Sequence, residues 1–197
     1  GTESHVFLGD THRDRVFDGE YRMFLPAETK REPYPARLGN MTVGTVVEVG
    51  RAVRRFRVGD RVYGHLPIRE LHTVNGEGPR VGENFSLGSG VREARLHKVP
   101  EELADTKVVL LDPAHFALAA AHDAEIVLGD RVAVFGLGAI GLLIVQMARL
   151  SGATTVLAVD PLPNRRALAR TFGANEVLDP AAVDVGLEIK KLTGKQG

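Results

Sequence analysis

Apolar and polar residues follow two different patterns along the sequence. Residues 42–64 form β-branched, apolar runs that are repeatedly broken by glycines, as expected for the bent strands of a small barrel. From residue 130 onward, short apolar runs alternate with longer helical patterns, and this alternation favours a parallel α/β sheet. The sequence therefore predicts two domains, a strand-rich domain over residues 1–110 and an α/β domain over residues 111–197.

The first domain is expected to contain short strands, turns and one long loop. Residues 1–35 carry few regular signals, and Pro26, Pro33 and Pro35 mark loop. The expected elements are a helical turn at 3–8, a strand at 42–50, a turn and strand at 58–64, a loop at 65–90, a strand at 94–99 and a helix at 108–123.

The second domain is expected to alternate strictly between strands and helices. Its first strand leads into a glycine turn, and Gly152 and Gly173 each follow a helical pattern at the position where glycine commonly ends a helix. The elements after the turn are a helix at 142–151, a strand at 154–159, a helix at 163–172, a strand at 176–178 and a helix at 183–193.

The glycine turn carries the clearest chemistry in the chain. Gly136, Gly138 and Gly141 have the G-x-G-x-x-G spacing of the dinucleotide-binding fingerprint, between an apolar strand and a helix. The first glycine permits the turn, the second lets the backbone approach a pyrophosphate, and the third lets helix and strand pack closely. The helix N-terminus would then face the phosphate charge. The predicted cofactor-binding turn comprises Gly136, Leu137, Gly138, Ala139, Ile140 and Gly141.

An acidic residue closes the next expected strand. Asp160 comes 19 residues after Gly141, where the fingerprint places a carboxylate that holds the ribose hydroxyls. Its charge would repel a 2′-phosphate, so NAD is favoured over NADP as the cofactor. Arg165 and Arg166 temper this preference, because an arginine just beyond the strand can hold such a phosphate. We include Arg165 among the predicted cofactor-binding residues.

Composition narrows the possible partners. The chain has 25 Lys and Arg and 25 Asp and Glu residues, and no basic stripe indicates nucleic acid. Its apolar runs are too short to span a bilayer, and no signal-peptide pattern opens the chain. We therefore expect a cytoplasmic protein with neither a nucleic-acid nor a membrane partner. Cysteine is absent, which excludes disulfides and thiolate metal ligands within these residues.

Four motifs, taken in their order and spacing, resemble the medium-chain dehydrogenase/reductase superfamily, which includes the zinc-dependent alcohol dehydrogenases. They are Gly44-Thr45-Val46-Val47-Glu48-Val49-Gly50, Val58-Gly59-Asp60-Arg61-Val62, the stretch from Leu128 to Gly138, and Phe172-Gly173-Ala174. The resemblance covers nearly all of the chain. It implies an α/β protein with a GroES-like β-barrel catalytic domain followed by a Rossmann domain, a doubly wound parallel sheet.

The resemblance also implies an activity and an assembly. The activity is reversible hydride transfer between NAD(P) and an alcohol or carbonyl substrate, in a homo-oligomer that is a dimer or a tetramer. The chain opens in the middle of a motif and holds only about three of the six strands of a full Rossmann domain. It is therefore expected to be a piece of a larger protein, with both domains incomplete.

The catalytic positions of the zinc-dependent branch match this chain only in part. By resemblance, Thr2 falls on the proton-relay hydroxyl and His5 on a histidine that ends the relay in some members. The metal-ligand histidine and its neighbouring carboxylate are replaced by Asn40 and Met41. A third ligand would fall near Asp112. Because catalytic zinc needs three protein ligands, Asp112 alone does not make a site, and zinc is not expected.

Without zinc, a hydroxyl and a histidine must serve as general acid and base. Thr2 and His5 are the pair that the resemblance places for this role, and the alternative is a capping hydroxyl beside a surface histidine. His65 and Leu66 follow the second barrel strand and are candidates for the substrate pocket. The remaining candidates, His72, His115 and His122, have no spacing that suggests a metal site.

Two other functions stay open at this point. Zinc-independent quinone and enoyl reductases share the fold, although they usually prefer NADPH. A nucleotide-binding sensor or structural protein that kept the fold and lost its chemistry is the non-enzymatic alternative.

Overall fold

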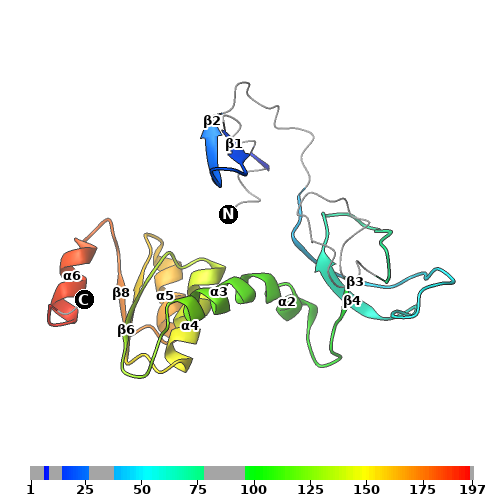
Figure 1. Cartoon of the computed structure of the whole chain (residues 1–197). Coiled ribbons are helices and arrows are strands. Elements are labelled where there is room, and N and C mark those ends of the chain that lie inside the picture. Colours follow the sequence, from blue (N-terminus) through cyan, green and yellow to red (C-terminus); the bar gives the residue numbers. More distant parts are fainter. Residues whose placement is uncertain (1–6, 9–14, 27–37, 78–95, 196–197) are drawn as a thin grey trace. The chain divides into compact units, whose positions relative to one another are not determined.

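The computed structural model describes residues 7–8, 15–26, 38–77 and 96–195 (Figure 1). The chain divides into two compact units, Gly1–Val109 and Leu110–Gly197. In the described part of the chain, no helix is both long and apolar enough to cross a membrane. Of the helical turn expected at residues 3–8, only Phe7 and Leu8 are described.

The first unit contains a hairpin that the sequence prediction missed. Strand β1 (Arg15–Asp18) pairs antiparallel with β2 (Met23–Pro26), within a stretch that was expected to hold few regular elements. The carboxylate of Asp18 accepts hydrogen bonds from the backbone N–H groups of Glu20 and Tyr21, at 2.8 and 2.9 Å. A side chain that caps its own turn in this way stabilises the reversal, and Asp18-Gly19 between apolar residues was the available signal.

A three-stranded antiparallel sheet follows, with β3 (Met41–Thr45) and β5 (His97–Lys98) on either side of β4 (Arg61–His65). Strand β3 ends five residues earlier than the expected strand at 42–50. The pairing nevertheless continues for one more residue, because Val46 exchanges backbone hydrogen bonds with Gly59 and Asp60. The inward side chains form a small apolar core of Phe56, Val62, Leu66 and Leu96.

Polar contacts fix the start of β4. The Asp60 carboxylate pairs with Lys98 Nζ at 2.7 Å and accepts the Arg57 N–H at 3.0 Å. The Lys98 hydrogen bond, together with that of Arg57, holds the pKa of Asp60 below its ordinary value. Arg61 donates to the Leu103 carbonyl at 2.7 Å and pairs with Asp105. These contacts attach the segment that leaves the sheet to its central strand.

The helix expected at 108–123 is confirmed from Leu111 to Asp123, but its start at Val108 is wrong. The structure has α2 (Asp105–Val108) and α3 (Leu111–Asp123), separated by Val109 and Leu110. Pro113 lies in the first turn of α3 and has no N–H to donate to the Val109 carbonyl, which a continuous helix would require. Proline is tolerated in a first turn but not in a helix interior, so the helix starts again here.

The second unit has the alternating order that the sequence predicts. Its strands β6 (Arg131–Phe135), β7 (Thr155–Val159) and β8 (Glu176–Leu178) form a parallel sheet in the order β6-β7-β8. The helices are α4 (Ala139–Leu150), α5 (Pro163–Thr171) and α6 (Val185–Leu192). The prediction of these elements is confirmed to within a few residues at each end. The largest difference is that α4 begins three residues early, because Gly138 serves as its N-cap.

The core of this unit lies between the sheet and helices α4 and α5. Val145 and Ala148 of α4 are fully buried against Val156 and Ala158 of β7. Fully apolar strands are typical of parallel sheets that are covered on both faces. The apolar cluster holds the carboxyl ends of β6 and β7 side by side, where the residues of the predicted cofactor site begin.

Candidate functional site

The glycine turn joins the end of β6 to the start of α4. Gly136 has a φ of +86°, a conformation that L-residues rarely adopt, and its N–H donates to the Val159 carbonyl at 2.8 Å. A Cβ on Gly141 would overlap the Gly136 carbonyl oxygen. A Cβ on Gly138 would meet no protein atom within 4 Å. The positive φ of Gly136 and the close contact at Gly141 are the turn and packing features expected of the fingerprint, and the open space beside Gly138 leaves room for a pyrophosphate to approach.

The other three residues of the turn divide between the core and the surface. Leu137 is fully buried, whereas Ala139 and Ile140 are exposed in the first turn of α4. The backbone of Leu137 is also fixed, because its N–H donates to Asp160 Oδ2 at 2.8 Å. The turn is thus held from both the apolar core and the neighbouring strand.

Asp160 directly follows β7 and is almost completely buried, with 3% of its surface exposed. Its Oδ2 accepts the Leu137 N–H and its Oδ1 accepts the Leu162 N–H, each at 2.8 Å. Burial raises the pKa of this carboxyl, but the two backbone N–H groups and the charge of Arg165 outweigh burial and hold the pKa below its ordinary value of 3.8. The carboxylate is therefore charged at neutral pH and lies against the glycine turn.

Arg165 and Arg166, neighbours on α5, make different contacts. Arg165 is about half exposed, and its Nη1 lies 3.5 Å from Asp160 Oδ2. Arg166 is largely buried, and its Nη1 donates to the carbonyls of Asp160 and Pro161, both at 2.7 Å. Sequence reasoning treated both as possible phosphate ligands, and only the structure separates them.

In the first unit, the structure brings Asn40 and His65 together. Asn40 Oδ1 lies 2.8 Å from His65 Nδ1, and the Asn40 carbonyl accepts the Leu66 N–H at 3.0 Å. The preceding Gly39 has a φ of +115°, and a Cβ there would lie 2.8 Å from Pro67 Cα. The turn before β3 is thus tightly packed, which holds the Asn40 side chain beside the end of β4. No sequence pattern pointed to this pair.

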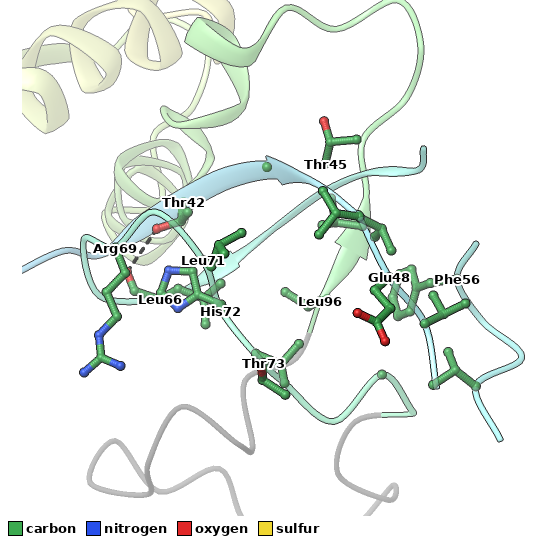
Figure 2. A pocket seen from close by; sticks show the side chains of 18 of the residues that line it. Thr42, Thr45, Glu48, Phe56, Leu66, Arg69, Leu71, His72, Thr73 and Leu96 are labelled. Carbon is green, nitrogen blue, oxygen red and sulfur yellow. Dashed lines mark hydrogen bonds between the residues drawn. The ribbon is translucent and has the colours of Figure 1, made fainter. Parts of the chain in front are cut away.

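Leu66 is directed away from His65, since successive strand residues face opposite sides. Leu66 is buried and lines a cavity of about 600 Å³ in the first unit (Figure 2). Its carbonyl accepts the Thr42 hydroxyl at 3.0 Å. His72 also lines this cavity, and among the described residues neither of its buried ring nitrogens has a hydrogen-bond partner. His65 is exposed and does not line the cavity.

Thr2 and His5, the expected proton-relay pair, lie outside the described residues. Asp112 lies in the first turn of α3 in the second unit, and His115 and His122 lie on the same helix. The ranges that the structure describes contain no group of three or more His, Cys, Asp or Glu side chains that could hold a metal ion.

Comparison with known proteins gives one matching family model in each of the two units. Residues 7–99 match the family model of the alcohol dehydrogenase GroES-like domain. Residues 139–197 match the model of the zinc-binding dehydrogenase domain. The chain belongs to the medium-chain dehydrogenase/reductase superfamily. The expected fold, a GroES-like domain followed by a Rossmann-type domain, is thereby confirmed.

Members of the superfamily with known names are similar to this chain over most of its length. D-guloside 3-dehydrogenase from Escherichia coli (strain K12) is 40% identical over 188 residues, which cover 93% of the chain and 50% of that protein. The structure of 2R,3R-butanediol dehydrogenase from Bacillus subtilis matches with a TM-score of 0.61 and 32% identity, over 83% of the chain and 50% of that protein. The chain therefore spans about half the length of these relatives.

A second similar structure bears on the cofactor. A candidate zinc-binding dehydrogenase from Sinorhizobium meliloti 1021 that is bound to NADP matches with a TM-score of 0.61 and 28% identity. The match covers 93% of the chain and 52% of that protein. Membership of the superfamily supports NAD(P) as the cofactor class for this chain.

The described residues do not by themselves fit the zinc of the zinc-binding dehydrogenases. The position at which the resemblance expects a zinc-ligand histidine carries Asn40. The side-chain oxygen of Asn40 is within hydrogen-bonding distance of His65 Nδ1. A neutral amide is a weak zinc ligand compared with Cys, His or a carboxylate. Asp112, the position near which the resemblance places a third ligand, lies in the second unit.

Proposed function

We propose that the chain is part of an NAD-dependent oxidoreductase that transfers hydride between the cofactor and an alcohol or carbonyl substrate. The observation that carries this proposal is the charged Asp160 carboxylate, fixed at 2.8 Å from the Leu137 N–H of the glycine turn. Two hydroxyls of an adenosine ribose are suitable donors to this carboxylate. The named relatives act on a sugar derivative and on a diol, so we extend the proposal to substrates with several hydroxyl groups.

Turnover across a panel of sugars, diols, simple alcohols and enones tests this activity. Reduction of NAD by hydroxyl compounds supports it. Reduction of enones without any alcohol oxidation would instead support a quinone or enoyl reductase. A protein that binds the cofactor and converts no compound would support a sensor.

The preference for NAD over NADP rests on charge. A 2′-phosphate would meet the Asp160 carboxylate, and Arg166 is already engaged by two backbone carbonyls. We expect NADH to bind at least about tenfold more tightly than NADPH, equivalent to about 1.4 kcal/mol. Fluorescence titration with each cofactor measures this ratio, and equal or tighter binding of NADPH would contradict the argument from Asp160.

The proposed chemistry uses no catalytic zinc. Thr2 and His5 would move the hydroxyl proton as general acid and base, since an unperturbed histidine has a pKa of about 6.5. His65 is proposed to contribute to the substrate pocket from its place beside Asn40, and Leu66 from the cavity that it lines on the opposite face of the strand. We expect the purified protein to hold well under one zinc per chain and its turnover to resist chelators. Elemental analysis checks this, and one tightly held zinc per chain would refute it.

A further inference from the structure

Helix α5 carries two adjacent arginines, whose side chains differ in exposure and in the contacts that they make. Arg165 has about half of its side chain in solvent, and its guanidinium contacts the Asp160 carboxylate at 3.5 Å. Arg166 is 18% exposed and makes three contacts. Two are the hydrogen bonds to the Asp160 and Pro161 carbonyls, and the third is an ion pair of 3.0 Å between its Nη2 and Asp179 Oδ2.

These contacts tie together the ends of two neighbouring parallel strands. Asp160 is the first residue after β7, and Asp179 is the first residue after β8. Asp179 is itself held in a turn, because its carboxylate accepts the Ala181 N–H and its carbonyl accepts the Ala182 N–H, both at 3.0 Å. Arg166 thus links the backbone that carries Asp160 to a fixed anchor on the adjacent strand.

The direction of the Asp160 side chain depends on this backbone. Its carboxylate spans from Leu137 in the glycine turn to Leu162 before α5. Arg166 approaches the same residue from the carbonyl side. A rotation of the peptide between Asp160 and Pro161 would move the carboxylate away from the turn, and small misplacements of a binding group are costly.

We propose that Arg166 and Asp179 are positioning residues for the cofactor, which hold the end of β7 so that the Asp160 carboxylate meets the adenosine ribose. Arg165 is the arginine that faces the 2′ position of that ribose. The inference rests on the proposed use of a nicotinamide dinucleotide. It assigns cofactor affinity to Arg166 and cofactor selectivity to Arg165.

The matched substitutions Arg166→Met and Arg165→Met test this division in the full chain. Met keeps much of the side-chain length and removes the charge. We expect Arg166→Met to weaken NADH and NADPH about equally, by about tenfold. Arg165→Met should weaken NADPH several-fold more than NADH, because it removes the cation beside the 2′ position. Fluorescence titration gives both dissociation constants and the number of sites.

A role limited to general stability would lower the number of binding-competent molecules and leave their dissociation constant unchanged. Asp179→Asn provides a milder variant, because it keeps the shape of the side chain and the Arg166 hydrogen bonds to the carbonyls. We expect it to weaken the binding of both cofactors about threefold, as for loss of one partly exposed charge pair, with a thermal midpoint close to that of the wild type.

Three results would overturn the inference. They are wild-type affinity for NADH in both Arg166→Met and Asp179→Asn, a loss confined to NADPH in Arg166→Met, and a fall in site number with an unchanged dissociation constant. A wild-type chain that binds neither cofactor would overturn the proposed function itself, and the inference with it. Binding by the wild type with no response to either variant overturns the inference alone.

Discussion

Replacement of Gly141 by alanine is expected to destabilise the second unit by about 3 kcal/mol or more, at the upper end of the cost of overpacking a core. The added Cβ would overlap the Gly136 carbonyl oxygen, and backbone cannot turn aside as a flexible side chain does. Helix α4 would have to move away from the turn, which breaks the packing of Val145 against the sheet. Urea unfolding measures the loss, and cofactor titration should show no binding.

Gly138→Ala is the matched control in the same turn. No protein atom lies within 4 Å of the added Cβ, so we expect an unfolding midpoint near that of the wild type. Cofactor affinity should still fall, because a methyl group would occupy the place where backbone approaches the pyrophosphate. If Gly141→Ala has the unfolding free energy of the wild type, α4 does not pack closely on the turn at Gly141. If Gly138→Ala binds NADH normally, the pyrophosphate does not lie there.

Asp160→Asn is expected to cost about 2–3 kcal/mol of unfolding free energy and most of the affinity for NADH. The carboxylate accepts an N–H on each oxygen, from Leu137 and from Leu162. An amide has one acceptor oxygen, so its NH₂ group must face one of these two donors. One buried N–H then loses its partner, and the remaining hydrogen bond loses its charge. Urea unfolding and NADH titration measure the two effects.

Asp184→Asn is the control for this substitution. Asp184 caps α6 by accepting the single Leu187 N–H at 3.0 Å, and asparagine is about as good a helix N-cap as aspartate. Its unfolding free energy should therefore stay within about 0.5 kcal/mol of the wild type. Equal losses of unfolding free energy in the two variants would show that the two hydrogen bonds accepted by Asp160 stabilise the fold no more than the single one accepted by Asp184.

The Asp160→Asn variant also gives a pH test. Because the pKa of Asp160 in the folded chain lies below its ordinary value of 3.8, its charge stabilises the fold above that ordinary value. The contribution is lost as pH falls through the lower, folded pKa. The stability difference between wild type and Asp160→Asn should therefore be constant near neutral pH and shrink below about pH 4. If the stability difference between the two proteins instead grows in acid, the pKa of Asp160 is not lowered in the folded chain.

The parts of the structure that follow local rules could be predicted from the sequence. The G-x-G-x-x-G spacing, the apolar run before Asp160 and the terminal Gly152 and Gly173 each act through neighbouring residues, so they identify the elements of the second unit. Membership of the superfamily was likewise visible in short motifs. The break before Leu111 also has a local cause, because Pro113 is disfavoured in a helix interior. The alanine-rich stretch around it nevertheless favours one continuous helix, which is what the sequence predicts.

Contacts between distant residues could not be predicted in this way. The link from Arg166 to Asp179 depends on the adjacent positions of β7 and β8, and the bond between Asn40 and His65 depends on the register of β3 and β4. Sequence spacing gives no sign of either contact. The two adjacent arginines of α5, Arg165 and Arg166, look equivalent in sequence because only the fold decides which one is turned inward.

The all-parallel sheet of the second unit has a consequence for the order in which a nascent chain can fold. Hairpin β1–β2 closes over four residues, whereas β6 meets β7 only after the whole of α4 has been made. Local hairpins form within microseconds, and pairings that need a long crossover are slower. Until Val156 and Ala158 leave the ribosome, the apolar face of α4 has no sheet to cover it. The interval between the emergence of α4 and the emergence of β7 is therefore one in which this apolar face is exposed to aggregation.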